Sequence, residues 1–317
     1  MMKILANDGI SQSGIDALEK GGFEVITTKV AQNQLENYIN EHNIDGILVR
    51  SATQVRQELI DACPSIKLIG RGGVGMDNID VEYAQEQGLH VINTPAASSS
   101  AVAELVFAHL FGLARCLHSS NREMPLEGDS RFKELKKAYS QGIELKGKTI
   151  GIIGFGKIGQ EVAKIGLGLG MKVIATDEII TSAPISVEFF NGQKITININ
   201  TVTKDELLKE SDFISLHVPA QEDYIITKSE IEKMKDGVGI INTARGGILH
   251  EVDLVTAIES GKVQFAGLDV FETEPTPAVQ LLMNPEISLT PHIGAGTKET
   301  QDRIGIELAQ QIMKLLS

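Results

Sequence analysis

The sequence is poor in the features that stabilise small secreted proteins or bind polyanions. Cys63 and Cys116 are the only cysteines in 317 residues and do not have metal-ligand spacing, so neither a disulfide framework nor a metal site is expected. Asp and Glu outnumber Lys and Arg by 42 to 29, and the net charge of −13 argues against nucleic acid or an anionic membrane as a partner. No apolar run approaches the length of a membrane span, and the N-terminus becomes polar too soon for a signal peptide. We therefore expect a cytoplasmic protein.

Glycine, by contrast, is concentrated in an informative pattern. Gly154, Gly156 and Gly159 form G-x-G-x-x-G between a predicted strand at 148–153 and a predicted helix at 157–170. In this pattern the glycines allow a tight turn, a close approach to a pyrophosphate and close packing of helix on strand. The helix N-terminus adds free N–H groups and a positive dipole end. The segment predicts a dinucleotide site.

A carboxylate follows at the expected distance. A second strand at 171–176 ends at Asp177, which comes 23 residues after Gly154. An acid there can accept hydrogen bonds from the adenosine ribose hydroxyls. Asp177 and the neighbouring Glu178 would both repel a 2′-phosphate, so the prediction is NAD rather than NADP.

Alternating strands and helices indicate two parallel α/β units. In the first unit, strands are expected at 3–7, 24–27, 46–49, 67–70 and 90–93, with helices at 13–20, 32–41, 55–62 and 81–87. A long apolar helix is expected at 98–117, followed by a polar, exposed arm at 119–142. In the second unit, further strands are expected at 213–218, 239–243, 265–270 and 287–289, and the tail from Thr297 is one amphipathic helix.

Local signals define three smaller features of the second unit. Thr203 with Glu206, and Ser229 with Glu232, have capping-box spacing and predict helix starts. Residues 185–190 and 194–198 predict a β-hairpin with a two-residue turn at Asn191. We expect this hairpin to be a surface excursion without chemistry.

Three charged or titratable residues follow predicted strand ends, where open α/β sheets place ligands. His292 is a candidate proton carrier because histidine is the side chain most often used for proton transfer, and Glu274 would stabilise the resulting imidazolium. Arg245 can hold a substrate carboxylate through two hydrogen bonds. Taken singly, each residue could equally be an ordinary loop or surface residue. Together with a dinucleotide site they predict a hydride-transfer enzyme.

An ordered set of motifs resembles the NAD-dependent D-isomer-specific 2-hydroxyacid dehydrogenases, and within them the phosphoglycerate dehydrogenase branch. The resemblance runs over nearly the whole chain. It rests on the glycine-rich loop and on the segments 50–53 (RSAT), 75–80 (GMDNID), 93–95 (NTP), 103–105 (AEL), 242–247 (NTARGG), 268–271 (LDVF) with 274–275 (EP), and 291–295 (PHIGA).

The resemblance implies a role for each site residue. Arg245, Glu274 and His292 would be catalytic. The cofactor would lie against Gly154, Gly156, Lys157, Ile158, Gly159, Asp177, His217, Thr243, Ala244, Arg245, Asp269, His292, Gly294 and Ala295. Asp269 would face the nicotinamide carboxamide, and His217 would contribute packing or a cofactor contact. The substrate would lie against Arg50, Ser51, Arg71, Gly73, Arg245 and His292, with Arg50 and Ser51 beside its phosphate.

The family's fold implies a particular domain order. A Rossmann NAD-binding domain (residues 98–290) would be inserted into a flavodoxin-like parallel α/β substrate domain (residues 1–97 and 291–317). The helix and arm at 98–142 resemble the family's subunit-contact region and imply a homodimer. Since the chain stops after the closing helix, we expect no regulatory serine-binding domain.

Three functions are compatible with this resemblance. The leading one is NAD-dependent oxidation of D-3-phosphoglycerate to 3-phosphohydroxypyruvate, the entry to serine biosynthesis. The second is another reaction of the same type, as in hydroxypyruvate or glyoxylate reductases and D-lactate dehydrogenase. The third is NAD sensing by a binding protein similar to the corepressors that share this fold.

Overall fold

The computed structural model describes residues 1–316, which form two compact units. The outer unit comprises Met1–Ala101 and the C-terminal segment from Ala295, and the inserted unit comprises Val102–Gly294. The boundaries predicted from the sequence lie at 97/98 and 290/291, and the substrate and cofactor roles of the two units stay predictions.

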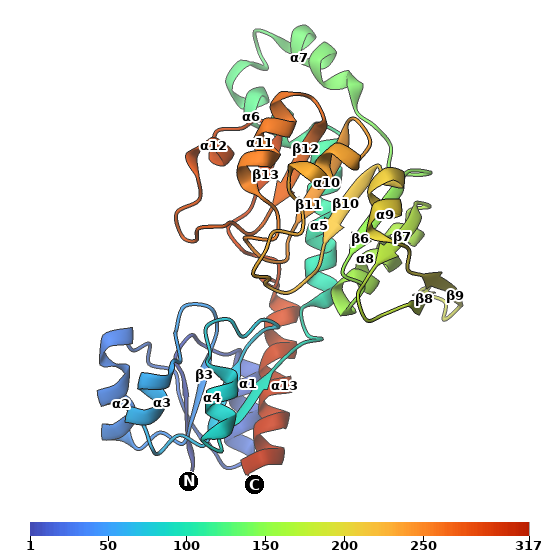
Figure 1. The fold of residues 1–317 in the computed structure, drawn as a ribbon. Helices are drawn as coiled ribbons and strands as arrows, with labels where there is room; N and C mark the ends of the chain where they lie inside the picture. Colours follow the sequence, from blue (N-terminus) through green and yellow to red (C-terminus); the bar gives the residue numbers. More distant parts are fainter. Residues whose placement is uncertain (317) are drawn as a thin grey trace. The chain divides into compact units, whose positions relative to one another are not determined.

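The outer unit is built on a five-stranded, fully parallel sheet (Figure 1). Its strands, in spatial order, are β2 (Glu24–Ile26), β1 (Lys3–Ala6), β3 (Gly46–Val49), β4 (Leu68–Arg71) and β5 (His90–Asn93). Helices α1 (Gln12–Lys20) and α13 (Lys298–Leu316) cover one face, and α2 (Leu35–His42), α3 (Gln57–Ala62) and α4 (Val81–Glu86) cover the other. A 3₁₀ turn, η1 (Gln32–Gln34), precedes α2. The strand order reverses between β1 and β3, so the loops after these two strands flank the position where such sheets bind ligands.

Alternation along the strands explains the two layers of this unit. Along β1, Ile4 points to the side of α1 and α13, whereas Leu5 points to the side of α2 to α4. Leu48 and Ile47 of β3 alternate in the same way, and all four side chains are almost fully buried. This period of two is the pattern expected of a strand covered on both faces.

The inserted unit contains a six-stranded parallel sheet (Figure 1). Its strands, in spatial order, are β13 (Ile287–Leu289), β12 (Val263–Leu268), β11 (Val238–Asn242), β10 (Phe213–Leu216), β6 (Thr149–Ile153) and β7 (Lys172–Thr176). One face packs on α5 (Ser99–Ala114) and α8 (Lys157–Gly168). The other packs on α9 (Lys204–Glu210), α10 (Lys228–Lys233), α11 (Glu251–Glu259) and α12 (Val279–Leu282). The order reverses between β6 and β10, which places a second ligand-binding position after β6.

The connector helix is shorter than the sequence analysis expects, and the arm after it is helical. α5 ends at Ala114, and Cys116 adopts a left-handed conformation with φ of 54°. The arm then forms α6 (Leu117–Glu127), α7 (Phe132–Ala138) and η2 (Tyr139–Gln141). A long apolar run alone could not reveal this break, because left-handed backbone at a non-glycine residue leaves no sequence signal. Among residues 1–316, no single helix is long and apolar enough to cross a membrane; only α5 and α6 taken together pass that test, and they are bent by 57°.

The hairpin forms as predicted, but its turn is longer. β8 (Ser182–Glu188) pairs with β9 (Lys194–Asn200) in antiparallel register. Phe189 N–H donates to Gln193 O at 2.8 Å, which leaves three residues rather than two in the loop. Ala183, Ile185 and Ile199 are buried against the inserted unit, so the hairpin's base is part of that core.

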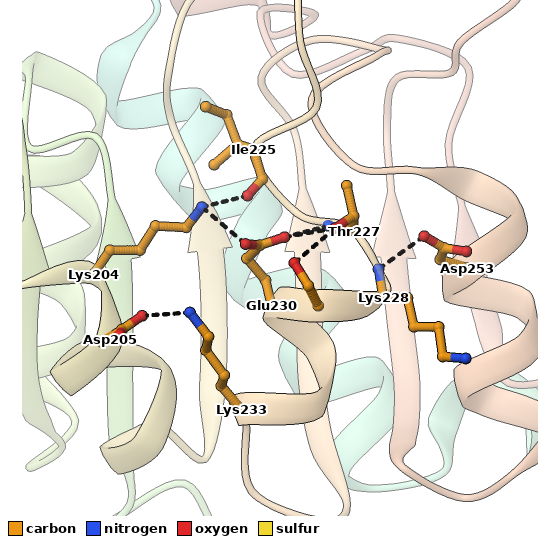
Figure 2. A network of polar contacts seen from close by, with 9 residues as sticks. Lys204, Asp205, Ile225, Thr227, Lys228, Glu230, Lys233 and Asp253 are labelled. Carbon is orange, nitrogen blue, oxygen red and sulfur yellow. Dashed lines mark hydrogen bonds and ion pairs between the residues drawn. The ribbon is translucent and has the colours of Figure 1, made fainter.

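The helix start predicted at Thr203 is confirmed, whereas the capping box of α10 begins two residues earlier in the chain than predicted. Thr203 caps α9 as expected, accepting from Glu206 N–H. For α10 the cap is Thr227, whose N–H and hydroxyl both bond to Glu230, instead of Ser229 with Glu232. Figure 2 shows that Glu230 also lies beside Lys204, whose ammonium donates to the Ile225 carbonyl at 2.6 Å. This network ties the loop after β10 to helices α9 and α10.

Candidate functional site

In the turn between β6 and α8, Gly154 and Gly159 lie close to neighbouring backbone, whereas the space beside Gly156 is open. A Cβ at Gly154, where φ is +93°, would lie 2.5 Å from the His217 carbonyl oxygen, and one at Gly159 would lie 2.2 Å from the Gly154 carbonyl oxygen. A Cβ at Gly156 would meet nothing within 4 Å. Gly156 is also the N-cap of α8, and no side chain caps that helix. The open position and the uncapped helix start together form a cradle for an anion.

Asp177 stands at the end of β7, beside this turn. Its Oδ2 accepts from Phe155 N–H at 2.6 Å, and its Oδ1 accepts from Ile179 and Ile180 N–H at 2.9 Å each. Burial acts to raise the pKa of Asp177, but the three backbone bonds outweigh it and lower the pKa. The carboxylate is therefore charged at neutral pH, and it remains partly exposed.

Two buried polar atoms lie just past the central strands without a partner among residues 1–316. They are Nδ1 of His217, after β10, and Oγ1 of Thr243, after β11. The other ring nitrogen of His217 is 2.8 Å from Ser215 Oγ, and burial lowers the pKa of His217 to about 3, so the ring is neutral. Buried polar atoms are normally satisfied, and a dinucleotide carries the hydroxyl and amide groups that could do so. The residues predicted to bind NAD in this unit thus fit that group.

Arg245 is carried on a tight turn directly after β11. Asn242 closes the turn with both ends of its amide: Nδ2 donates to Arg245 O at 2.8 Å and Oδ1 accepts from Ala244 N–H at 3.1 Å. The guanidinium donates to the Ala244 carbonyl at 2.7 Å. A Cβ at Gly246 would lie 1.8 Å from the Phe271 carbonyl oxygen, so this turn packs directly on the segment that leads to Glu274.

Glu274 and His292 form an ion-pair geometry at the end of the sheet. Nδ1 of His292 is 2.9 Å from Oε2 of Glu274, and the two side chains are 45% and 37% exposed. Oε1 of Glu274 accepts from Phe271 N–H at 3.2 Å, which leaves Oε2 directed to the histidine. The arrangement brings together a proton carrier and an acid across 18 residues of sequence, and both stay accessible to a ligand.

Asp269 holds the loop that carries His292 through hydrogen bonds. This carboxylate is 1% exposed. Its Oδ1 accepts from Thr290 Oγ1 at 2.6 Å and from Ile293 N–H at 2.8 Å, and its Oδ2 accepts from Gly294 N–H at 2.8 Å. These hydrogen bonds of the Asp269 carboxylate all go to the loop of His292. Its predicted contact with the nicotinamide stays a prediction.

A pocket of about 390 Å³ opens beside the ion pair. Its wall is mainly apolar and includes Phe271, Leu282 and Leu289 together with Glu274 and His292. An apolar wall beside a charged pair lowers the local dielectric constant and strengthens the electrostatic interaction within the pair. No cluster of three or more His, Cys, Asp or Glu within residues 1–316 has a geometry suited to a metal ion.

The predicted substrate residues of the outer unit lie at the carboxyl ends of β3 and β4. Asp8 accepts from Arg50 N–H at 2.6 Å and from both the N–H and the hydroxyl of Thr53, which orders the loop that holds the exposed Ser51. The Arg50 guanidinium has no hydrogen bond or ion pair within residues 1–316.

Arg71 ends β4 and pairs in register with Val49. A Cβ at Gly73, where φ is +153°, would lie 1.6 Å from an Arg71 guanidinium nitrogen. Glycine at this position therefore makes room for the guanidinium.

Each unit thus brings together its own part of the predicted site. The inserted unit holds Arg245, Glu274, His292 and the cofactor residues up to Gly294, whereas Arg50, Ser51, Arg71, Gly73 and Ala295 belong to the outer unit. The sequence alone indicates no role for Asp8 or Asn242, which hold the loops of Arg50 and Arg245. Asp8 lies two residues after β1 and Asn242 ends β11, and this position at a strand end could have identified them.

Comparison with known proteins agrees with this geometry. Residues 107–294 match the family described as D-isomer specific 2-hydroxyacid dehydrogenase, NAD binding domain. The chain is similar to a hydroxypyruvate reductase of Thermotoga maritima, at 44% identity over 99% of this chain and 98% of that protein. It is 40% identical to a D-3-phosphoglycerate dehydrogenase of Methanocaldococcus jannaschii, over 100% of this chain but 58% of that protein, so it spans little more than half of that relative.

A solved structure gives the same result for the fold. The crystal structure of a glyoxylate reductase from Paecilomyes thermophila has a TM-score of 0.80 at 32% identity, covering 99% of this chain and 96% of that chain. The matched segment includes the glycine-rich turn, Arg245, Glu274 and His292. The chain belongs to the NAD-dependent D-isomer-specific 2-hydroxyacid dehydrogenases.

Proposed function

We propose that this protein oxidises D-3-phosphoglycerate to 3-phosphohydroxypyruvate, with His292 as the proton carrier. The proposal depends above all on the 2.9 Å contact between His292 Nδ1 and Glu274 Oε2. Because Nδ1 is engaged by the carboxylate, Nε2 is the ring atom left to take the proton from the substrate hydroxyl. NAD, when bound, supplies the hydride acceptor. In the reverse direction the imidazolium returns the proton to the carbonyl oxygen.

Glu274 has two roles in this scheme. Its negative charge stabilises the imidazolium that forms in the transition state, and its hydrogen bond fixes the orientation of the ring. The bond from Phe271 N–H to Oε1 holds the carboxylate in place. The mainly apolar pocket wall beside the pair strengthens the attraction between the carboxylate and the imidazolium.

Arg245 would bind the substrate carboxylate. A guanidinium can donate two parallel hydrogen bonds to a carboxylate, and it can also polarise the neighbouring carbonyl during reduction. The Asn242 amide and the packing of Gly246 on Phe271 support the turn that carries it. The same packing relates the turn of Arg245 to the segment of Glu274.

The phosphate would be bound from the outer unit by Arg50 and Ser51, with Arg71 as a further cation. Arg50 follows β3 at the position where the strand order reverses, and its guanidinium has no partner within residues 1–316. Ser51 is exposed beside it. A cation and a hydroxyl at this edge are suited to a dianionic phosphate.

A second candidate is the reduction of hydroxypyruvate. The relative from Thermotoga maritima carries that name and is covered over 98% of its length, whereas the phosphoglycerate dehydrogenase from Methanocaldococcus jannaschii is covered over 58%. The same His292, Glu274 and Arg245 would act on this substrate. The two candidates differ in the direction of the reaction and in whether the substrate carries a phosphate for Arg50 and Ser51 to bind.

A substrate panel followed by NADH absorbance tests the proposal. We expect 3-phosphoglycerate to be the best substrate, and His292→Ala to lower turnover by roughly 10²–10⁴-fold while NADH binding changes little. Arg50→Ala should raise the KM for 3-phosphoglycerate by roughly 10–100-fold, from the loss of a charge-assisted bond of about 1.5–3 kcal/mol.

Activity of Arg50→Ala on hydroxypyruvate or D-lactate should hardly change, because Arg245 binds the carboxylate. Preference of the wild type for hydroxypyruvate would select the second candidate. Near-normal turnover of His292→Ala would disprove the proton-carrier role in both.

A further inference from the structure

His109, a buried histidine, is connected by hydrogen bonds to the loop that carries His292. His109 is on α5 and is 3% exposed. Its Nε2 is 3.1 Å from Thr290 Oγ1 and its Nδ1 is 2.9 Å from Ser288 Oγ. Thr290 Oγ1 in turn is 2.6 Å from Asp269 Oδ1. Four side chains thus form one continuous chain of polar contacts, in which His109 and Asp269 are buried and Ser288 and Thr290 are partly buried.

The chemistry of the partners sets the direction of each bond. A carboxylate can only accept, so the single hydroxyl proton of Thr290 must go to Asp269. The Thr290 oxygen must then accept from His109 Nε2–H. In the neutral ring Nδ1 is an acceptor, and it receives the proton of Ser288. Burial lowers the pKa of His109, and the charge of Asp269 offsets this only in part, so the neutral ring is the relevant form at pH 7.

The end of this chain encloses His292 on both sides. Thr290 comes two residues before His292, and Ile293 and Gly294, which also bond to Asp269, directly follow it. Between these anchors, His292 has a φ of 55°, in the left-handed region that non-glycine residues rarely adopt. Such a conformation persists only where the surrounding contacts hold it in place.

The sheet makes space for the buried ring. A Cβ at Gly267 of β12 would lie 2.8 Å from His109 Cβ and 2.9 Å from its Cγ. Any larger residue at 267 would displace the ring. An apolar side chain at 109 could fill this space but could not donate to Thr290.

We propose that His109 is a positioning residue for the proton carrier: through Thr290 and Asp269 it fixes the backbone that holds His292 against Glu274. The inference rests on the proposed role of His292. His109 itself transfers no proton and does not touch the substrate. Its loss leaves the Thr290 hydroxyl without a donor, so Thr290 can rotate away from Asp269 and the loop loses one of its three anchors.

The test compares His109→Leu, Thr290→Val and the double variant with Ser288→Ala as the matched control. Ser288→Ala removes a partly buried hydrogen bond from the same ring, but that bond does not lead to the loop. We expect kcat to fall roughly 3–10-fold in His109→Leu and in Thr290→Val, the effect of one hydrogen bond of about 0.5–1.5 kcal/mol. The double variant should be no worse than either single one, because both break the same connection.

Three further measurements separate positioning from general stability. The Nδ1–H proton of His292, observed by NMR in the unliganded protein, should broaden or shift upfield in His109→Leu and stay unchanged in Ser288→Ala. His109→Gln, whose amide can still donate to Thr290, should recover most of kcat. The KM values for NAD and substrate should change less than twofold in all variants.

Three results would overturn the inference: equal losses of kcat in His109→Leu and Ser288→Ala, additive losses in the double variant, or an unchanged His292 resonance in His109→Leu. His292→Ala, measured in parallel, separates this failure from failure of the proposed function. If His292→Ala loses turnover and His109→Leu does not, only the positioning role is wrong. If His292→Ala retains turnover, the proton carrier itself is misassigned.

Discussion

Replacing Gly156 by alanine should impair NAD binding without disturbing the fold. Gly156 has φ of −70° and ψ of −163°, which alanine adopts freely, and a Cβ built there meets no atom within 4 Å. Alanine is a poorer N-cap than glycine, but it also restricts the unfolded chain, and the two effects are similar in size. The free energy of unfolding should therefore change by no more than about 1 kcal/mol.

The cost should fall on the cofactor instead. The second glycine of this pattern is where the backbone approaches a pyrophosphate, so the new methyl group would occupy the ligand's space. Forcing an extra carbon into a packed contact costs about 1–3 kcal/mol, which corresponds to roughly a 5- to 150-fold higher Kd for NADH. Gly159→Ala is the contrasting variant. Its Cβ would lie 2.2 Å from the Gly154 carbonyl oxygen, so it should lower the melting temperature as well.

Both quantities can be measured on the same samples. Titration of NADH by its fluorescence gives Kd, and thermal unfolding without cofactor gives stability. Wild-type NADH affinity in a well-folded Gly156→Ala variant would refute the placement of the pyrophosphate at this turn. A large loss of stability in Gly156→Ala would show instead that the apparent open space is required by the fold.

Three other predictions concern the cofactor, a buried acid and assembly. The value of kcat/KM should be at least about tenfold higher with NAD than with NADP, because the charge of Asp177 opposes a 2′-phosphate. Asp177→Asn should reduce that ratio, and its amide nitrogen or oxygen would then face the Phe155 N–H. An unchanged ratio would exclude Asp177 from the ribose site. Glu251→Gln should leave the protein as stable or more stable at pH 7. Burial and then the nearby charge of Glu272 raise the pKa of Glu251. The wild-type protein therefore loses stability as the pH rises above 4.5, the ordinary pKa of a glutamate. In urea unfolding, the advantage of the variant should disappear below that pH. Leu126 and Phe132 of the arm are 78% and 57% exposed, and we expect a homodimer that covers them. A mass of about 34 kDa, that of the monomer, from light scattering at micromolar concentration would contradict this prediction.

Much of the fold follows from local patterns in the sequence. The apolar run of β6, the glycines after it and the periodicity of α8 lie within some 20 residues, so hydrophobic period and turn chemistry predict them together. Arg245, Glu274 and His292 could be selected for a similar reason, since each follows a predicted strand. Parallel strands bring their carboxyl ends to one edge, so the meeting of Glu274 and His292 is a consequence of topology.

Where several local patterns compete, the sequence cannot decide between them. Thr227 with Glu230 and Ser229 with Glu232 have the same capping-box spacing. The structure uses the first, and Glu230 there also forms an ion pair with Lys204, a residue of another helix. The break at Cys116 is a similar case, since nothing in the apolar run before it marks a left-handed residue.

The support of the site was decided by tertiary structure alone. His109 contacts Ser288 and Thr290 across 179 and 181 residues, and Asp8 contacts Arg50 across 42. In the sequence His109 is one polar residue in an apolar helix. Its tautomer, its neutral charge and its link to His292 depend on burial and on bond directions that exist only once α5 has packed on the sheet. Local sequence determined which residues stand at the strand ends, whereas long-range packing determined what holds them in place.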